Sequence, residues 1–248
     1  MVYAQYRLGC ELLAAMPPDM KRTVGRFRQL YDMGLHGPEL LNFCNQGQKF
    51  RLQTGAAFFE RVCRAVRMER SEGAMAYLYG LIAHYAISSI SSSFLNRTAE
   101  SLSIRTGKIR TEFDRYLLEK DGKKPPYRHD RSQHIRLTPG ECETVALFYP
   151  GISAGTIGKC VKRMNRVMHL PVMPAGSKRD LVVKVMTLRG QGDFVMDTHP
   201  DYRLKDANEG LLRLYELARE HYSSLLEQIQ TRLRKKYTLS PDFSLPMG

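Results

Sequence analysis

A histidine and a serine lie four residues apart in the most apolar part of this chain. His84 is the only histidine or charged residue between Ala76 and Leu95, and Ser88 follows one helical turn later. Both side chains therefore point from one face of a helix. A histidine could activate a serine nucleophile, but no Gly-x-Ser-x-Gly turn or partner acid accompanies this pair. We therefore favour a core histidine whose ring hydrogen-bonds to a backbone carbonyl.

The stretch that carries this pair, Ala76 to Leu95, is apolar on all sides of a helix. Such a helix is either the buried centre of an all-helical domain or a membrane span. Its second half contains serines at positions 88, 89, 91, 92 and 93, which disfavour insertion into lipid. No second apolar run of this length exists. We therefore expect a central buried helix and no transmembrane span.

Apolar residues at helical spacing recur along most of the chain, which has 248 residues and is 43% hydrophobic. The pattern predicts an all-α fold in a single domain, 1–248, with a long surface loop at about 121–139 and a shorter loop at 96–107. Thr54 and the sequence Thr138 to Glu141 are predicted helix starts. Helices are expected over residues 2–16, 20–33, 54–70, 76–95, 108–120, 140–148, 154–170 and 209–236, and 181–188 is a strand or, as we favour, a helix.

The chain is basic, with 38 lysines and arginines against 25 acidic residues and a formal charge of +13. This balance predicts attraction to polyanions such as nucleic acid, acidic lipid headgroups or phosphorylated small molecules. Many cytoplasmic proteins, however, are simply basic. Arg61, Arg64 and Arg67 are spaced to form a stripe on one helix, which is either a solvated face or a phosphate-binding surface. Nucleic-acid binding is therefore possible, but no motif for it is present.

Five cysteines are scattered without a Cys-x-x-Cys pair, and their number is odd. They are typical of reduced core residues. The first residues lack a basic leader before an apolar run, so we expect a cytoplasmic protein. His129, Asp130 and His134 could form a metal site, but they fall in the expected long loop, where a site is rarely preorganised.

Four local patterns stand out: Gly37-Pro38-Glu39, the run from Ala76 to Ala86, the run from Glu112 to Leu118, and the run from Leu214 to Ala218. Together they resemble the zinc-dependent phospholipase C family, in the branch found in clostridia and relatives. The patterns keep their order and spacing, and the resemblance covers about Ala4 to Arg232. It implies an all-α domain whose helices supply histidines and carboxylates to a cluster of zinc ions, which activates water for phosphodiester hydrolysis. A related branch of the same fold cuts single-stranded nucleic acid.

The resemblance also places the zinc ligands, and most of these positions are substituted in this chain. His84 and Glu39 keep residue types that the family uses. Neutral or basic residues stand at the other positions, and a catalytic zinc normally needs three protein ligands. Arg110 would repel a cation, because its guanidinium does not deprotonate. The substituted positions are Gln5, Gln53, Ser88, Ser92, Thr106 and Arg110.

These substitutions predict a catalytically inactive homologue, a pseudoenzyme with a degenerate zinc site and no cofactor, in which Glu39, His84 and Arg110 form a vestigial pocket. In this pocket Arg110 either pairs with Glu39, with His84 and the serines completing the network, or binds an anion such as phosphate. The expected partner is acidic or phosphate-bearing. The alternative is an active zinc-dependent phospholipase C or phosphodiesterase whose ligands come from elsewhere. A third reading is a basic nucleic-acid-binding protein. The spare ligand candidates are His36, His129, His134 and His199.

Overall fold

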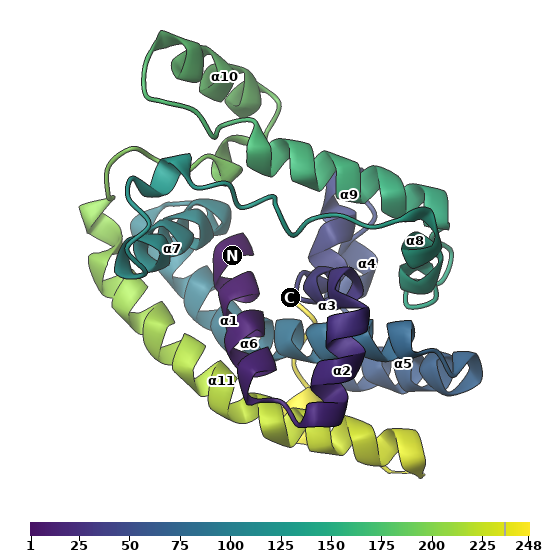
Figure 1. The fold of residues 1–248 in the computed structure, drawn as a ribbon. Coiled ribbons are helices and arrows are strands. Elements are labelled where there is room, and N and C mark those ends of the chain that lie inside the picture. Colours follow the sequence, from purple (N-terminus) through teal and green to yellow (C-terminus); the bar gives the residue numbers. More distant parts are fainter. Residues whose placement is uncertain (236) are drawn as a thin grey trace.

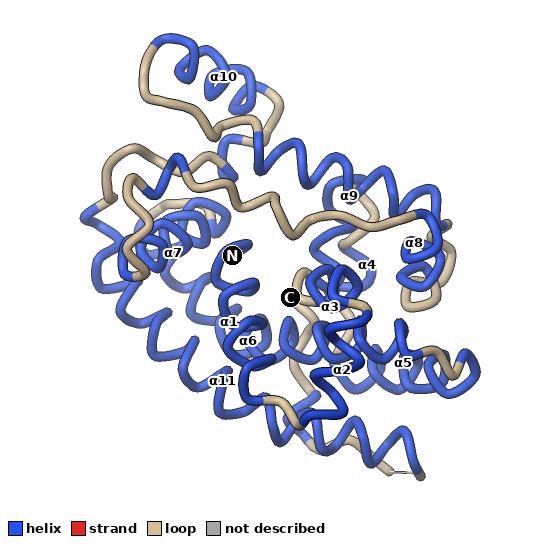
Figure 2. Tube along the Cα trace, in the orientation of Figure 1, coloured by secondary structure: helices blue, strands red, loops and turns tan. Residues whose placement is uncertain are grey.

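The computed structural model describes residues 1–235 and 237–248, and these residues form helices joined by loops, without a β-strand (Figure 2). The predicted all-α class is confirmed. A single cluster of buried apolar side chains joins nearly all of the helices. None of the helices in these ranges is long and apolar enough to cross a membrane.

The helix α6, Glu72–Leu102, runs through the centre of the molecule (Figure 1). Its middle is buried on every side, as the uniformly apolar sequence predicts. It begins where the side chain of Ser71 accepts a hydrogen bond from the amide of Ala74. The predicted loop over 96–107 is wrong for its first part, because the polar residues up to Leu102 form exposed turns that extend the same helix.

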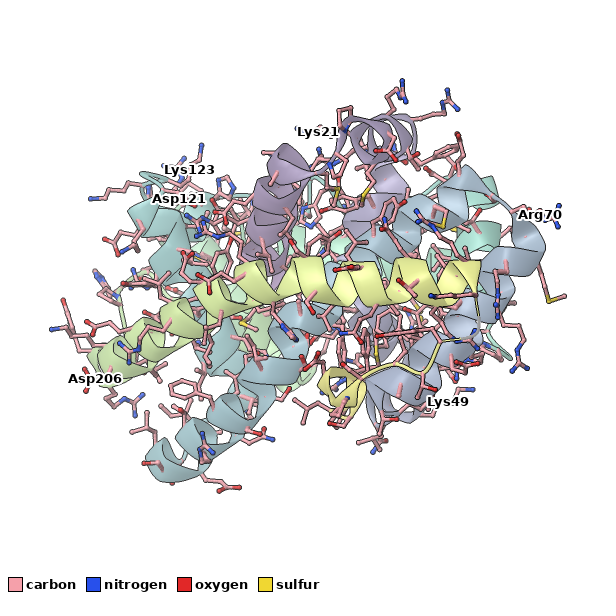
Figure 3. The ribbon with its side chains drawn as sticks, turned by 90° about the horizontal axis from the view of Figure 1, so that it is seen from below. Lys21, Lys49, Arg70, Asp121, Lys123 and Asp206 are labelled. Carbon is pink, nitrogen blue, oxygen red and sulfur yellow. The ribbon has the colours of Figure 1, made fainter. Side chains whose placement is uncertain are left out.

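Around α6 lie the other helices, several of which pack directly on it. In Figure 3 the long helix α11 crosses one face of the molecule, and the labelled charged residues, among them Lys21 and Arg70, lie at its edge. The segment predicted as one helix over 20–33 is split at Phe27 into α2 and α3. Lys236, at the end of the predicted last helix, falls outside the described residues. The remaining α-helices are α1 (Val2–Ala15), α2 (Pro18–Arg26), α3 (Arg28–Gly34), α4 (Gln48–Arg51), α5 (Gly55–Glu69), α7 (Thr106–Lys120), α8 (Pro139–Ala146), α9 (Ala154–His169), α10 (Ser177–Leu188) and α11 (Lys205–Arg234).

Short 3-10 helices complete the structure and include η1, which carries the Gly-Pro-Glu pattern. The predicted helix starts at Thr54 and at Thr138 with Glu141 are confirmed by their capping hydrogen bonds. The ambiguous segment around 181–188 is helical, as we favoured. The 3-10 helices are η1 (Gly37–Cys44), η2 (Pro126–Arg128), η3 (Gly192–Phe194), η4 (Tyr202–Leu204) and η5 (Pro241–Phe243).

The predicted long loop at about 121–139 is present. Its first part, 121–125, is exposed as expected, but its middle part packs against the body. Figure 2 shows it running from α7 to α8 past α9. Arg131, Ser132 and Ile135 are buried. Asn165 of α9 donates hydrogen bonds to the carbonyl oxygens of Ser132 and Ile135, both at 3.0 Å. We call this segment the strap.

Helices α3 and α6 cross where Gly34 faces Gly80. A Cβ atom at Gly80 would overlap the carbonyl oxygen of Tyr31, and one at Gly34 would overlap the carbonyl oxygen of Tyr77. Because the obstructing atoms on both sides are backbone, neither can move without separating the helices. This close crossing brings the end of α3 and the start of η1 against the middle of α6.

Replacing Gly80 by alanine should lower the free energy of unfolding by about 3 kcal/mol, because the added methyl group forces α3 away from α6. Gly25 offers a control, since it is exposed in α2 and a Cβ there meets nothing within 4 Å. Gly25→Ala should raise stability by about 0.5 kcal/mol through helix propensity. Urea unfolding measures the free energy of unfolding of both variants. If Gly80→Ala is as stable as Gly25→Ala, the close crossing of α3 and α6 is refuted.

Candidate functional site

The amide of Gln5 lies at the centre of a buried hydrogen-bonded network. Its Nε2 is 3.2 Å from Oε2 of Glu39 and 3.2 Å from Nδ1 of His84, and its Oε1 is 3.1 Å from Nδ1 of His36. A glutamine amide nitrogen only donates and its oxygen only accepts, so each bond has a fixed direction. Helix α1 supplies Gln5, α6 supplies His84, and the segment at and before η1 supplies His36 and Glu39.

The directions of these bonds define the tautomer of each buried imidazole. The carbonyl oxygen of Met247 only accepts, so Nε2–H of His84 donates to it at 3.0 Å. In the neutral ring Nδ1 then accepts from Gln5, and it also lies 3.3 Å from the carbonyl oxygen of Leu35. Nδ1–H of His36 donates to Gln5, so its Nε2 accepts from Nε2–H of His134 at 2.8 Å. A second proton on His36 would oppose this pattern, because its Nε2–H would then face the N–H of His134.

Burial keeps the three imidazoles neutral. It lowers the pKa of His84 and lowers the pKa of His36 well below its usual value, with the neighbouring His134 adding to the effect on His36. Burial lowers the pKa of His134 to about 3. The ring of His134 also stacks on Tyr6, with centroids 4.1 Å apart. The network is therefore a set of neutral, oriented rings rather than a proton-exchanging one near neutral pH.

Arg110 and Glu39 form an ion pair beside this network. Nη1 of Arg110 donates to Oε1 of Glu39 at 2.5 Å, and the two side chains are 19% and 14% exposed. Burial opposes ionisation of Glu39, but nearby positive charges, Arg110 first among them, hold its pKa well below the ordinary value. Nε of Arg110 is buried without a hydrogen-bond partner. Of the two arrangements predicted for Arg110 from the sequence, this is the first, in which Arg110 pairs with Glu39.

Ser89, Ser91 and Ser92 of α6 do not complete the network as that prediction supposes, whereas Ser88 approaches His84. Oγ of Ser92 donates to the carbonyl oxygen of Ser88 at 2.6 Å, and Ser89 and Ser91 likewise bond back to their own helix. Oγ of Ser88 lies 3.5 Å from Nε2 of His84, at the limit of a hydrogen bond. These serines therefore satisfy their hydroxyls locally, which explains how a buried helix tolerates them.

Two other positions on the predicted list lie in different places. Thr106 begins α7 and lines the same cavity as Arg110. Gln53 lies outside that cavity, accepts a hydrogen bond from Arg61 at 2.7 Å and donates to the carbonyl oxygen of Lys49. The structure thus brings Gln5, Glu39, His84, Ser88 and Arg110 together, but not Gln53.

A cavity of about 300 Å³, which we call the inner pocket, opens beside Arg110 and Glu39. Three arginines and three carboxylates line it. Glu39 pairs with Arg110, Asp114 pairs with Arg131 at 3.1 Å, and Asp193 pairs with Arg105, which stands outside the lining. The lining residues are Met1, Val2, Glu39, Asn42, Phe43, Arg51, Thr106, Gly107, Arg110, Thr111, Asp114, Arg131, Met164, Gly190, Asp193 and Phe194.

Arg51 adds a further guanidinium to the inner pocket, and its charge helps to lower the pKa of Glu39. Its Nε donates to the main-chain oxygen of Gly248 at 3.1 Å, and it forms no ion pair with Asp or Glu within residues 1–235 and 237–248. The first turn of α7, at Thr106 and Gly107, adds to this charge because it has neither an acidic residue nor a side-chain cap. The pocket therefore presents guanidinium groups to a ligand, whereas the side chain of Asp193 already lies against the start of α7 at Gly107.

Asp114 anchors the helix that carries Gln5, and sequence reasoning did not single out this role. Its carboxylate accepts from the amides of Val2 at 2.9 Å and Ala4 at 3.0 Å, and from Nη1 of Arg131. It thereby caps the start of α1 from another helix, since α1 has no side-chain cap of its own. Asp114 lies in the run from Glu112 to Leu118 that contributes to the family resemblance. The residues around it do not indicate that it contacts a helix more than a hundred residues away in the sequence.

The other sequence candidates are dispersed. His129 packs against the ring of Tyr3, Asp130 accepts from Ser132 and pairs with His169, and His199 is exposed. Of the spare histidines, only His36 and His134 reach the network. Within the described parts of the chain, no three groups of the histidine, cysteine or carboxylate kind converge in a way that could hold a metal ion.

The predicted arginine stripe on α5 is not a uniform cationic face. Arg61 turns inward, with its guanidinium 4.8 Å from the ring centre of Phe58, and burial lowers its pKa. Arg64 and Arg67 remain exposed. Two exposed arginines are a weaker phosphate-binding surface than the three that the spacing predicts.

The residues around Glu39 and His84 do not fit a zinc cluster. The carboxylate of Glu39, which a metal would need as a ligand, is already paired with the guanidinium of Arg110. The positive charge of Arg110 would repel a cation bound there. The lone pair of Nδ1 of His84 is directed at the amide of Gln5. Amide and hydroxyl groups at the remaining positions are weak zinc donors.

Comparison of the chain with protein-family models, curated proteins and solved structures finds no match.

Proposed function

We propose that this protein is a non-catalytic member of the phospholipase C fold that binds a phosphate-bearing ligand in the inner pocket. The motifs near Glu39, His84 and Asp114 support the family relationship. The contact between Arg110 and Glu39 supports the loss of metal-dependent hydrolysis. Arg110 stands at a position where the resemblance implies a zinc ligand, and its permanent positive charge pairs with the carboxylate of Glu39. The protein accordingly acts by binding rather than by cleaving a phosphodiester.

The observation that carries the proposal is the position of Arg51. It faces the same cavity as Arg110 and the start of α7. Among the residues that the structure describes it forms no ion pair with an Asp or Glu side chain, and its Nε is held by the main-chain oxygen of Gly248. Guanidinium groups and free helix N–H groups are the donors that proteins use for phosphate. The ion pair with Glu39 orients Arg110, while Arg51 supplies the charge that the ligand neutralises.

Replacing Arg51 by methionine should weaken the binding of inorganic phosphate about tenfold or more, the loss expected for a charged hydrogen bond. Isothermal titration calorimetry at constant ionic strength measures the affinity of both proteins. Lys49→Met is the matched control, because Lys49 lies on the same short helix but outside the inner pocket. This control removes the same charge and should leave the affinity unchanged.

Two results would contradict the proposal. Wild-type protein that binds no phosphate at millimolar concentration would show that the inner pocket is not a phosphate site. Equal affinities of Arg51→Met and Lys49→Met would show that net charge alone, and not this pocket, attracts the anion. Cleavage of a phosphodiester by the wild-type protein supplied with zinc, lost in His84→Ala, would instead favour an active hydrolase.

The remaining features agree with an intracellular binding protein but do not define its partner. All five cysteines are free, which suits the reducing cytoplasm that we propose as its location. The inward turn of Arg61 reduces the case for a nucleic-acid surface on α5. The basic charge of the chain favours an acidic or phosphorylated partner.

A further inference from the structure

A second cavity adjoins the inner pocket and is lined by arginines without any carboxylate. We call this cavity, of about 470 Å³, the outer pocket. Arg163 and Arg166 reach it from α9, and Arg189 reaches it from the end of α10. Its other lining residues are polar amides and apolar side chains. The complete lining is Asn42, Phe43, Asn45, Arg163, Arg166, Val167, Leu170, Arg189, Gly190, Gln191 and Phe194.

The three arginines of the outer pocket are not used by the protein's own acids. No ion pair involving Arg163, Arg166 or Arg189 occurs in the described ranges. Arg163 is oriented by a hydrogen bond of 3.3 Å from Nη1 to the carbonyl oxygen of Phe43. Like charges held around one cavity repel each other, and an anion between them removes that repulsion.

The two pockets share one wall. Asn42, Phe43, Gly190 and Phe194 line both cavities. The rings of Phe43 and Phe194 pack together with centroids 5.2 Å apart. A ligand group that passes this wall would contact apolar ring surface, with arginines in the pocket on either side. The difference in charge is clear, because the inner pocket contains three paired carboxylates and the outer pocket contains none.

We infer that the outer pocket is a second phosphate-binding subsite, so that the ligand of this protein carries two phosphate groups. The second half of this inference rests on the proposed function of the inner pocket, whereas the outer subsite stands on its own arginines. Guanidinium groups bind phosphate oxygens through paired N–H donors, and three of them around one cavity suit a doubly charged group. The shared aromatic wall accommodates the part of the ligand that joins the two phosphates.

Titration with inorganic phosphate, followed by calorimetry at constant ionic strength, tests the two subsites separately. Wild-type protein should bind phosphate at two sites. The double variant Arg166→Met with Arg189→Met should lose one of them and keep the site that depends on Arg51. Arg97→Met with Arg213→Met is the matched control, since it removes the same charge from α6 and α11 outside both pockets. It should retain both sites.

The outcomes separate the two proposals. A single wild-type site that is lost in Arg51→Met but unaffected by the outer-pocket variant would overturn the outer subsite and leave the proposed function standing. A single site lost only in the outer-pocket variant would support the outer subsite and contradict the inner one. Equal losses in the outer-pocket variant and its control would overturn the inference, because net charge would then explain the binding.

Tripolyphosphate tests whether one ligand engages both subsites. It should bind at one molecule per chain and at least tenfold more tightly than phosphate, since the second contact becomes intramolecular. Both Arg51→Met and the outer-pocket variant should weaken it about tenfold. Tripolyphosphate binding that is unchanged by either variant would overturn the two-phosphate ligand. Binding of an oligonucleotide but of neither small anion would overturn it in favour of a nucleic-acid surface.

Discussion

Replacing Asp114 by alanine should lower the free energy of unfolding by about 3–5 kcal/mol, because it leaves a buried arginine without its partner. Asp114 and Arg131 are 1% and 3% exposed, so water cannot replace the lost contact. The same carboxylate accepts from the amides of Val2 and Ala4, which would lose their acceptor at the start of α1. Urea unfolding followed by circular dichroism measures the change.

An exposed ion pair provides the control for this prediction. Glu216 pairs with Arg219 on the surface of α11, with side chains 42% and 48% exposed. Glu216→Ala should change the free energy of unfolding by less than about 0.5 kcal/mol. If the double variant Asp114→Ala with Arg131→Met is no more stable than Asp114→Ala alone, the unpaired arginine is not the cause of the loss. A small effect of Asp114→Ala itself would contradict the role of this residue in holding α1.

Acidification from pH 7.5 to 5.5 should destabilise the protein by about 3 kcal/mol through His36 and His134 alone, because each folded imidazole stays neutral while the unfolded ones become protonated. The sign follows from the lowered pKa of both groups in the folded state, with that of His134 at about 3. The loss begins near the unfolded pKa and continues as the pH falls towards the folded values. His84, whose pKa is also lowered, adds to it.

Other buried groups modify the size of this effect but not its origin. Burial raises the pKa of Asp32 and Glu112, so these carboxyls act in the opposite direction. His134→Gln should reduce the pH dependence by about 1.4 kcal/mol over the same interval, since one titrating imidazole is removed. His199→Gln, which changes an exposed histidine, should not alter it. Equal slopes for the two variants in urea unfolding at both pH values would contradict a buried, neutral His134.

Features set by neighbouring residues could be predicted from the sequence. The side chains of Thr54 and Thr138 cap helices within three residues of themselves, so the local sequence contains the whole interaction. The apolar run around His84 likewise identifies the central helix. Its C-terminal end could not be predicted, because the exposed turns of a helix and a polar loop have the same composition.

The network at the site depends on segments that are distant in sequence, and this part could be predicted only in outline. The resemblance places Gln5, Glu39 and Arg110 at related positions and motivates an ion pair. Nothing in the sequence indicates that part of the strap folds inward. The sequence therefore predicts His134 in a surface loop, whereas in the structure it contacts His36. The arginines of the outer pocket come from α9 and from the end of α10, and only the fold places them around one cavity.

The zinc content of the purified protein tests the central claim most directly. The protein would be expressed with zinc supplied, freed of any histidine tag, dialysed and measured by elemental analysis. We predict that far less than one zinc ion per chain is retained, because Arg110 holds the carboxylate of Glu39 and its charge excludes a cation. Several zinc ions per chain would contradict this account and would show that the site is a metal centre.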